Sequence, residues 1–213
     1  MQLERESKVQ TMKNSVNNRI ELIGNEKIDW LVEEMIKRIE VAYASREQFH
    51  HDFKLLGEVF YGKSVDDKLT KEEIGSDWIC LPEGYESYDI EGLLFVSEGT
   101  PPYAFHDYIL EHASKLDPKV IVGMRYEHYY PHFIGVRYIT FHNGVIHKFE
   151  KKLDTSNYRV VTDAEVDDLK IKLTEDEIDD IVISWDDLAD LQEKLNKDAL
   201  QDLRIFLKYN KRT

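Results

Sequence analysis

The stretch Glu91-Gly92-Leu93-Leu94-Phe95-Val96-Ser97-Glu98-Gly99-Thr100-Pro101-Pro102 decides the fold. Residues 93–96 form a short apolar run, which is typical of a buried strand. Thr100 is a residue type that caps helix starts, and the two prolines stand where a helix tolerates missing backbone donors. The stretch therefore predicts a buried strand followed by a helix that Thr100 caps.

The residues after this stretch predict one helix and three strands. The helix has an apolar and aromatic face at three-and-four spacing, made of Phe105, Tyr108, Ile109, His112 and Leu116. It ends at Asp117-Pro118, because the residue before a proline is pushed out of helical geometry. Alternation predicts strands over residues 120–126, 134–138 and 145–149, and Asn143-Gly144 predicts a two-residue hairpin turn between the last two.

The residues before the stretch predict the first strand and helix. Residues 16–23 alternate in part and end at Gly24, and Asn25 then caps a helix. That helix carries the clearest apolar stripe in the chain: Ile28, Leu31, Val32, Met35, Ile36, Ile39 and Tyr43. Residues 78–81, closed by Pro82, predict a short strand. This order of elements favours a split β-α-β arrangement in an antiparallel sheet with helices on one face.

The last part of the chain changes character. Helix starts are indicated at residues 162–165, 174–177 and 184–187, each with an acid shortly after a Ser or Thr. A final helix is indicated by Leu200, Leu203, Phe206 and Leu207. We expect a C-terminal bundle of short helices after a linker at residues 154–157.

Composition and charge narrow the function classes. The chain has 213 residues, 28 basic and 42 acidic, with a formal net charge of −14, which argues against a general nucleic-acid binder. The 13 acids and two bases of residues 162–193 account for −11 of that charge. One cysteine, Cys80, forms no intrachain disulfide, and no apolar run approaches the roughly 18 residues of a membrane span. A cytoplasmic protein is the simplest interpretation.

Three motifs together resemble a known family. They are Asn18-Arg19-Ile20-Glu21-Leu22-Ile23-Gly24 before an amphipathic helix, Ser97-Glu98-Gly99-Thr100-Pro101-Pro102, and the closing Asn143-Gly144 turn. They resemble the ferredoxin-like domain of Api-like phage and mobile-element proteins, whose members open with an asparagine-containing strand that ends in glycine. The resemblance covers roughly residues 14 to 150. It implies a ferredoxin-like fold and a phage or mobile-element setting, and it carries over no catalytic motif.

The expected architecture is therefore α+β. A flexible arm spans residues 1–15, and a ferredoxin-like antiparallel sheet with helices on one face spans residues 16–153. A bundle of short acidic helices spans residues 158–213 as an appendage.

Two clusters could carry chemistry. His128 and His132 flank one turn and His142 and His147 flank another, so they could form a metal site if both turns lay at one sheet end. No ligand-spacing motif is present, which favours turn-flanking histidines with no metal and no cofactor. Glu98 and Glu127 would form an acid-base pair only if their strands were neighbours. Charges at a helix start and at a hairpin end are the favoured interpretation.

Aromatic residues are dense between Tyr103 and Tyr138. Aromatics on such a sheet can stack on the bases of single-stranded nucleic acid, but only Arg125 and Arg137 are basic and well placed nearby. The same residues could pack as core or anchor a protein partner.

The acidic span offers the other candidate surface. Seven of its 13 acids fall in proposed first helical turns, where they favour the helix dipole, and the rest are free to meet a basic partner. The candidate partner-binding residues are Asp167, Asp168, Asp179, Asp180, Asp190, Glu193, Tyr129 and Tyr130. The sequence thus favours a non-enzymatic phage or mobile-element accessory protein that binds a basic protein, with inhibition of a host defence complex as the sharpest version of this hypothesis. The alternatives are a single-stranded nucleic-acid-binding module and an uncharacterised metal-dependent enzyme.

Overall fold

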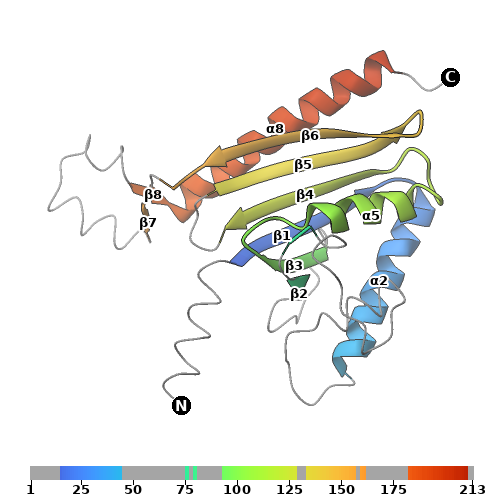
Figure 1. The fold of residues 1–213 in the computed structure, drawn as a ribbon, viewed down its shortest axis with the longest axis horizontal. Helices are drawn as coiled ribbons and strands as arrows, with labels where there is room; N and C mark the ends of the chain where they lie inside the picture. The colour runs from blue at the N-terminus through green and yellow to red at the C-terminus, as the bar shows by residue number, and fades with distance from the viewer. Residues whose placement is uncertain are drawn as a thin grey trace, which may run out of the picture.

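The protein has an α+β fold built on an antiparallel sheet (Figure 1). The computed structural model describes residues 15–44, 75–76, 79–80, 93–128, 133–156, 159–161 and 182–210. Within these residues the strands are β1 (Ser15–Ile23), β2 (Ile79–Cys80), β3 (Leu93–Glu98), β4 (Ile121–His128), β5 (Phe133–His142), β6 (Val145–Asp154), β7 (Arg159–Val161) and β8 (Val182–Ser184). The helices are α2 (Glu26–Ala44), α5 (Tyr103–Ala113) and α8 (Trp185–Tyr209). The predicted arm lies outside the described residues except for Ser15.

Strand β1 occupies the centre of the main sheet, whose order is β2-β3-β1-β4-β5-β6. It pairs antiparallel with β3 on one side and with β4 on the other. Strands β3 and β4 therefore run parallel to each other with β1 between them, and α5 connects them. Helix α5 therefore crosses from one strand to a parallel strand two positions away in the sheet. Strands β4, β5 and β6 continue as an antiparallel meander.

One face of the sheet holds the main core. Val16 and Ile20 of β1, Leu93 and Phe95 of β3, and Met124 of β4 are at most 1% exposed. Residues of α2 and α5 complete this core, among them Ile28, Met35, Phe105, Ile109 and Leu110. Both helices therefore pack on one face, because apolar side chains recur on a single face of each strand and on one stripe of each helix.

Helix α8 covers the opposite face over β5 and β6. Its Ala199 and Leu203 pack with Val136 and Tyr138, and its Leu188 packs with Ile134. Strand β5 is therefore buried on both faces, although its sequence predicted a half-buried strand. Across the described ranges, no helix is both long and apolar enough to cross a membrane.

The expected C-terminal bundle needs correction. The helix start at residues 184–187 and the final helix of Leu200, Leu203, Phe206 and Leu207 are one continuous helix of 25 residues. No breaker separates the two apolar runs, and both face the sheet, so one helix buries them together. Strands β7 and β8 form a small parallel pair, and residues 162–181 lie outside the described part of the chain.

Local turn chemistry follows the sequence with one exception. Asn25 caps α2, since its Oδ1 accepts the Lys27 backbone N–H at 3.0 Å. Asn143 and Gly144 have φ of 52° and 76°, as the hairpin turn requires. Thr100, however, is not the cap of α5.

Helix α5 begins at Tyr103 with Pro102 in the cap position, and the Thr100 hydroxyl donates to the Gly75 carbonyl at 3.3 Å. Each proline disfavours helical geometry in the residue before it, which displaces the start beyond Thr100. The helix also ends at Ala113, before the predicted end at Asp117-Pro118. Its buried face differs from the predicted one, since His106 and Leu110 are buried, whereas His112 is exposed.

The packing of α2 is testable at Met35, which is 8% exposed in the main core. We expect Met35→Ala to lower the free energy of unfolding by about 2–5 kcal/mol, as truncation of a buried methionine does. Trp30→Ala, on the same helix but at a site 56% exposed, should change it by less than about 1 kcal/mol. Equal losses in chemical denaturation would show that α2 does not pack on the sheet as described.

Candidate binding groove

The sheet face opposite the main core is covered only in part. Helix α8 lies over β5 and β6, and beside it the strands β3, β1 and β4 border a groove of about 360 Å³. The side chains that alternate onto this face form its floor, and α8 supplies one wall. The floor side chains are Asn17, Arg19, Leu94, Val96, Arg125 and Glu127, and Gln192 belongs to the wall. Its size and mixed lining suit a small ligand or a short segment of another chain.

Two arginines lie directly opposite each other in the floor. Arg19 of β1 is the cross-strand partner of Arg125 of β4. Side chains in such pairs start about 4.5–5.5 Å apart, and like charges there are destabilising. Arg125 Nη1 lies 3.4 Å from Glu193 Oε2 of α8, an ion pair in which both side chains stay partly exposed. The floor thus concentrates guanidinium groups, whose planar donors suit carboxylates and backbone carbonyls of a ligand.

Glu127 lies two residues beyond Arg125 on the same face and pairs across the strands with Asn17. Burial raises the pKa of its carboxyl above the ordinary value of 4.5. The folded chain therefore favours the neutral acid here more than the unfolded chain does. A neutral Glu127 could donate a hydrogen bond into the groove, and an ionised one would accept from a basic group.

The wall of the groove is held in place by polar contacts. The Tyr138 hydroxyl lies 2.8 Å from Glu21 Oε1 and 2.6 Å from Asn196 Oδ1, which joins β5, β1 and α8. Gln192 Nε2 donates to the Tyr126 carbonyl at 3.3 Å. Burial and Glu21 raise the Tyr138 pKa, so the phenol stays a donor across the physiological range. These bonds fix Gln192 and Glu193 at the edge of the floor.

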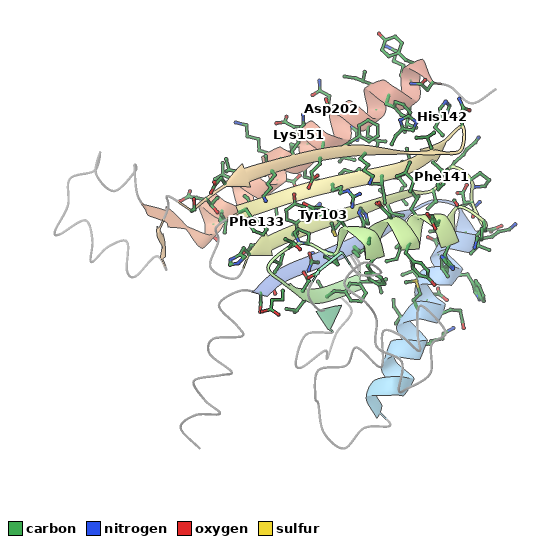
Figure 2. The ribbon with its side chains drawn as sticks, viewed as in Figure 1. Tyr103, Phe133, Phe141, His142, Lys151 and Asp202 are labelled. Carbon is green, nitrogen blue, oxygen red and sulfur yellow. The ribbon has the colours of Figure 1, made fainter. Side chains whose placement is uncertain are left out.

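A second polar cluster lies on the core face and ties α5 to β4 and β6. The hydroxyls of Tyr103 and Tyr126 both donate to Glu150 Oε1, at 2.7 and 2.6 Å (Figure 2 shows Tyr103). Burial raises the pKa of Tyr103 to about 12 and that of Tyr126 further. Both phenols are therefore held protonated as structural donors, and neither is poised as a base.

Arg137 extends this cluster. Its side chain is 3% exposed and donates to Asp107 Oδ1 at 2.6 Å, and Lys148 Nζ donates to the other carboxylate oxygen at 2.9 Å. Its Nη1 lies 3.3 Å from His106 Nδ1. Burial first, and then the Arg137 charge, lower the His106 pKa well below its ordinary value, so the ring stays neutral. Arg137 is thus committed to α5 and does not serve the groove.

The structure does not bring together the histidines or the carboxylates that the sequence offered as alternatives. His128, at the end of β4, lies near the start of β5, whereas His142 and His147 lie near the other end of that ten-residue strand, and His132 lies outside the described residues. His128 stacks on Phe133, and His142 and His147 both pack on Phe206. No group of three or more potential metal ligands occurs in the part of the chain described. Strand β1 separates the strands of Glu98 and Glu127, so these two are not neighbours.

The predicted partner-binding residues are covered only in part. Asp167, Asp168, Asp179, Asp180, Tyr129 and Tyr130 lie outside the described residues. Asp190 is exposed near the start of α8, and Glu193, one turn later, meets Arg125 at the groove. The sequence did not predict the groove, although the alternation of β1 places Arg19 and Asn17 on the face away from Val16 and Ile20. What it lacked was the strand order, which brings Arg125 to Arg19.

Comparisons with known proteins add no assignment. A scan against protein-family models, a search of curated proteins and a search of solved structures each found no match to this chain. The groove is therefore interpreted from its own residues.

The raised pKa of Glu127 predicts a pH-dependent stability. Because the folded pKa exceeds the unfolded one, ionisation of this group costs stability as pH rises from below 4.5 through the folded pKa. Glu127→Gln removes that cost. The free energy of unfolding of the variant, minus that of the parent, should therefore be larger at pH 7 than at pH 4. Chemical denaturation at both pH values measures this difference.

Glu111→Gln is the control, because it makes the same substitution at an exposed site on α5. A stability difference between Glu127→Gln and the parent that is equal at both pH values would contradict the burial of this carboxyl.

Proposed function

We propose that this chain is a non-enzymatic binding protein whose groove, together with the acidic residues that lead into α8, receives another protein. The floor offers the guanidinium groups of Arg19 and Arg125 and the carboxyl of Glu127, α8 offers the Gln192 amide, and β3 contributes the apolar Leu94 and Val96. The observation that carries the proposal is the placement of Arg19 and Arg125 as cross-strand partners in the floor, where both side chains offer donors to a partner carboxylate or carbonyl.

The charge distribution favours a protein over a nucleic acid as the occupant. A phosphate backbone needs a surplus of basic surface, whereas the chain carries −14 and the acids Glu127 and Glu193 stand beside the arginines. A protein segment can place an acidic group at the arginines and basic groups at the acidic rim. This combines the groove with the expectation of a basic partner surface for residues 162–193.

The biological setting is proposed from the resemblance of the sequence to Api-like proteins. We place the chain among phage or mobile-element accessory proteins that act in the cytoplasm, with a host defence complex as the sharpest candidate partner. A bond supports the idea that two of the shared motifs form one structural unit: Asn18 Nδ2 donates to Ser97 Oγ at 2.9 Å, and Ser97 Oγ donates to the Thr100 carbonyl at 2.8 Å.

The ferredoxin-like plan belongs to the same proposal. The succession β1, α2, β2, β3, α5, β4, with strand order β2-β3-β1-β4, is compatible with it. In this interpretation, β5, β6 and α8 are additions that extend the sheet and cover half of its second face.

Two other functions rank lower. A single-stranded nucleic-acid binder would need exposed aromatic rings, but Tyr126 and Tyr138 on the sheet are each 1% exposed. A metal-dependent enzyme would need ligands that converge, and His128 lies at the opposite end of β5 from His142 and His147. No cofactor is part of the proposal.

The proposal is tested with the partner that the full-length chain captures from infected or plasmid-bearing host cells. We expect Arg19→Gln/Arg125→Gln to raise its dissociation rate about tenfold or more, because partner groups lose their donors. Arg204→Gln/Lys208→Gln removes the same charge from exposed sites of α8 and should leave that rate unchanged. Surface-immobilised kinetics measures both.

A variant with Asn or Gln at the six acids Asp167, Asp168, Asp179, Asp180, Asp190 and Glu193 should slow association instead, and more so at low salt. Unchanged kinetics in the arginine variant would reject the groove as the binding site. Tight binding of a labelled single-stranded oligonucleotide that the arginine variant loses would favour the nucleic-acid alternative.

A further inference from the structure

Strand β6 is the last strand of the main sheet. It pairs with β5 along all ten of its residues, and no other strand within the described ranges pairs with its outer side (Figure 1). The outer side of an edge strand presents backbone donors and acceptors that can template another strand.

The hairpin geometry tells which residues face outward. Val145 pairs directly with His142 across the two-residue turn, so the odd-numbered residues of β6 exchange backbone bonds with β5. The backbone groups of the even-numbered residues then point outward, and their side chains share one face. Four of these side chains are charged and exposed, and their sign alternates: Lys148, Glu150, Lys152 and Asp154.

We propose that a second copy of this chain pairs antiparallel along β6, with Lys151 at the twofold axis. In this register Glu150 faces Lys152 of the other copy, and Lys148 faces Asp154, and the symmetry repeats both pairs. All four cross-strand contacts join opposite charges, and each such contact is favourable.

Neighbouring registers are disfavoured by the same side chains. Backbone bonding allows shifts only in steps that keep outward-facing residues opposite each other. One such step in one direction places Lys148 against Lys152 and Glu150 against itself. One step in the other direction places Lys152 against itself and Glu150 against Asp154. The charge pattern therefore disfavours both neighbouring registers, and the register with Lys151 at the axis forms the largest number of opposite-charge contacts.

Glu150 is bonded within its own copy and yet stays exposed. Its Oε1 accepts both Tyr103 and Tyr126, which fixes the carboxylate on the edge strand. A carboxylate has about four acceptor positions, so two phenols leave room for a lysine of the second copy. Lys152 is the residue that Glu150 would face in the other copy. Its Nζ lies 4.0 Å from the Phe133 ring centroid of its own copy, and the residue remains exposed.

The other sheet face is also compatible with a second copy. Lys151 Nζ binds Asp202 of α8 at 2.7 Å, and Figure 2 shows this pair between β6 and the helix. Each copy would therefore bring its own acid to the lysine at the axis. Ile205 and Tyr209 follow Asp202 at three and seven residues, on the same flank of α8, and are 47% and 79% exposed.

The spacing of the two copies of α8 fits helix packing. The helix contacts both β5 and β6, and strands are about 4.8 Å apart, so a helix centred between them stands about 5 Å from the axis. Its symmetry mate would then be about 10 Å away, near the usual 8–10 Å of packed helices. The exposed Ile205 and Tyr209 would lie toward this contact.

Charged edge strands can also serve to prevent pairing, as lysines on many natural edges do. A row of one sign would repel a second copy in every register, whereas the alternating row of β6 does not. The monomer is the opposing outcome of the experiment.

The experiment measures the mass of the full-length chain by sedimentation equilibrium at 0.15 M salt, where screening limits long-range repulsion to about 8 Å. We expect twice the chain mass of 25.1 kDa. Lys152→Glu and Glu150→Lys each create two like-charge contacts and should weaken the dimer about tenfold or more. In an equimolar mixture of the two variants, a heterodimer has four opposite-charge contacts, as the parent dimer does, and should therefore form.

A second measurement does not depend on Glu150, whose replacement could disturb the tyrosine cluster. In a Cys80→Ser background, Lys151→Cys should form an intermolecular disulfide on mild oxidation, because residue 151 faces itself at the axis. Asn143→Cys, exposed at the hairpin turn, should not. A monomeric parent at high micromolar concentration, or equal cross-linking of both cysteine variants, would overturn the proposal.

Discussion

The structure depends on the insertion of β1 between β3 and β4. These two strands are joined through α5 and run parallel, and the first strand of the chain fills the space between them. The alternation of β1 then serves two surfaces at once. Val16 and Ile20 point into the core with α2 and α5, whereas Asn17 and Arg19 point into the groove. Because register is fixed by the buried set, the position of Arg19 opposite Arg125 is fixed with it.

Helix α8 determines what the second face can do. It buries β5 from the side that α5 leaves open, and the Tyr138 hydroxyl of β5 connects its Asn196 to Glu21 of β1. A helix that lay further toward β1 would close the groove, and one that lay further out would expose Val136. The groove thus lies on one side of α8 and the β6 edge on the other. We propose that the groove binds a different protein and that the edge binds a second copy of this chain.

Much of the fold could be predicted from local signals. The apolar stripe of α2, the run before Ser97 and the Asn143-Gly144 turn each specify their elements, because spacing and turn residues act within a few positions. The start of α5 differs from the prediction because Thr100 is a typical cap residue, whereas the two prolines after Thr100 keep this threonine outside the helix. Sequence patterns divide the end of the chain into short helices, because an acid-rich turn resembles a helix start even when it lies inside a longer helix.

The site was harder to predict, because it depends on which strands become neighbours. The sequence shows Arg125 as a basic residue near aromatics, but its opposition to Arg19 follows from a pairing of residues more than 100 positions apart along the chain. The predicted aromatic surface has the same limitation: Tyr138 looks exposed by alternation until α8 covers it.

Arg19 and Arg125 stand directly opposite each other on neighbouring strands in the floor of the groove, where we propose that a partner binds. A double-mutant cycle of Arg19→Gln and Arg125→Gln, followed by chemical denaturation at low salt, measures their coupling directly. The account predicts a repulsive coupling of about 0.2–1 kcal/mol that falls as salt is added. An attractive coupling, or none at any salt concentration, would contradict it.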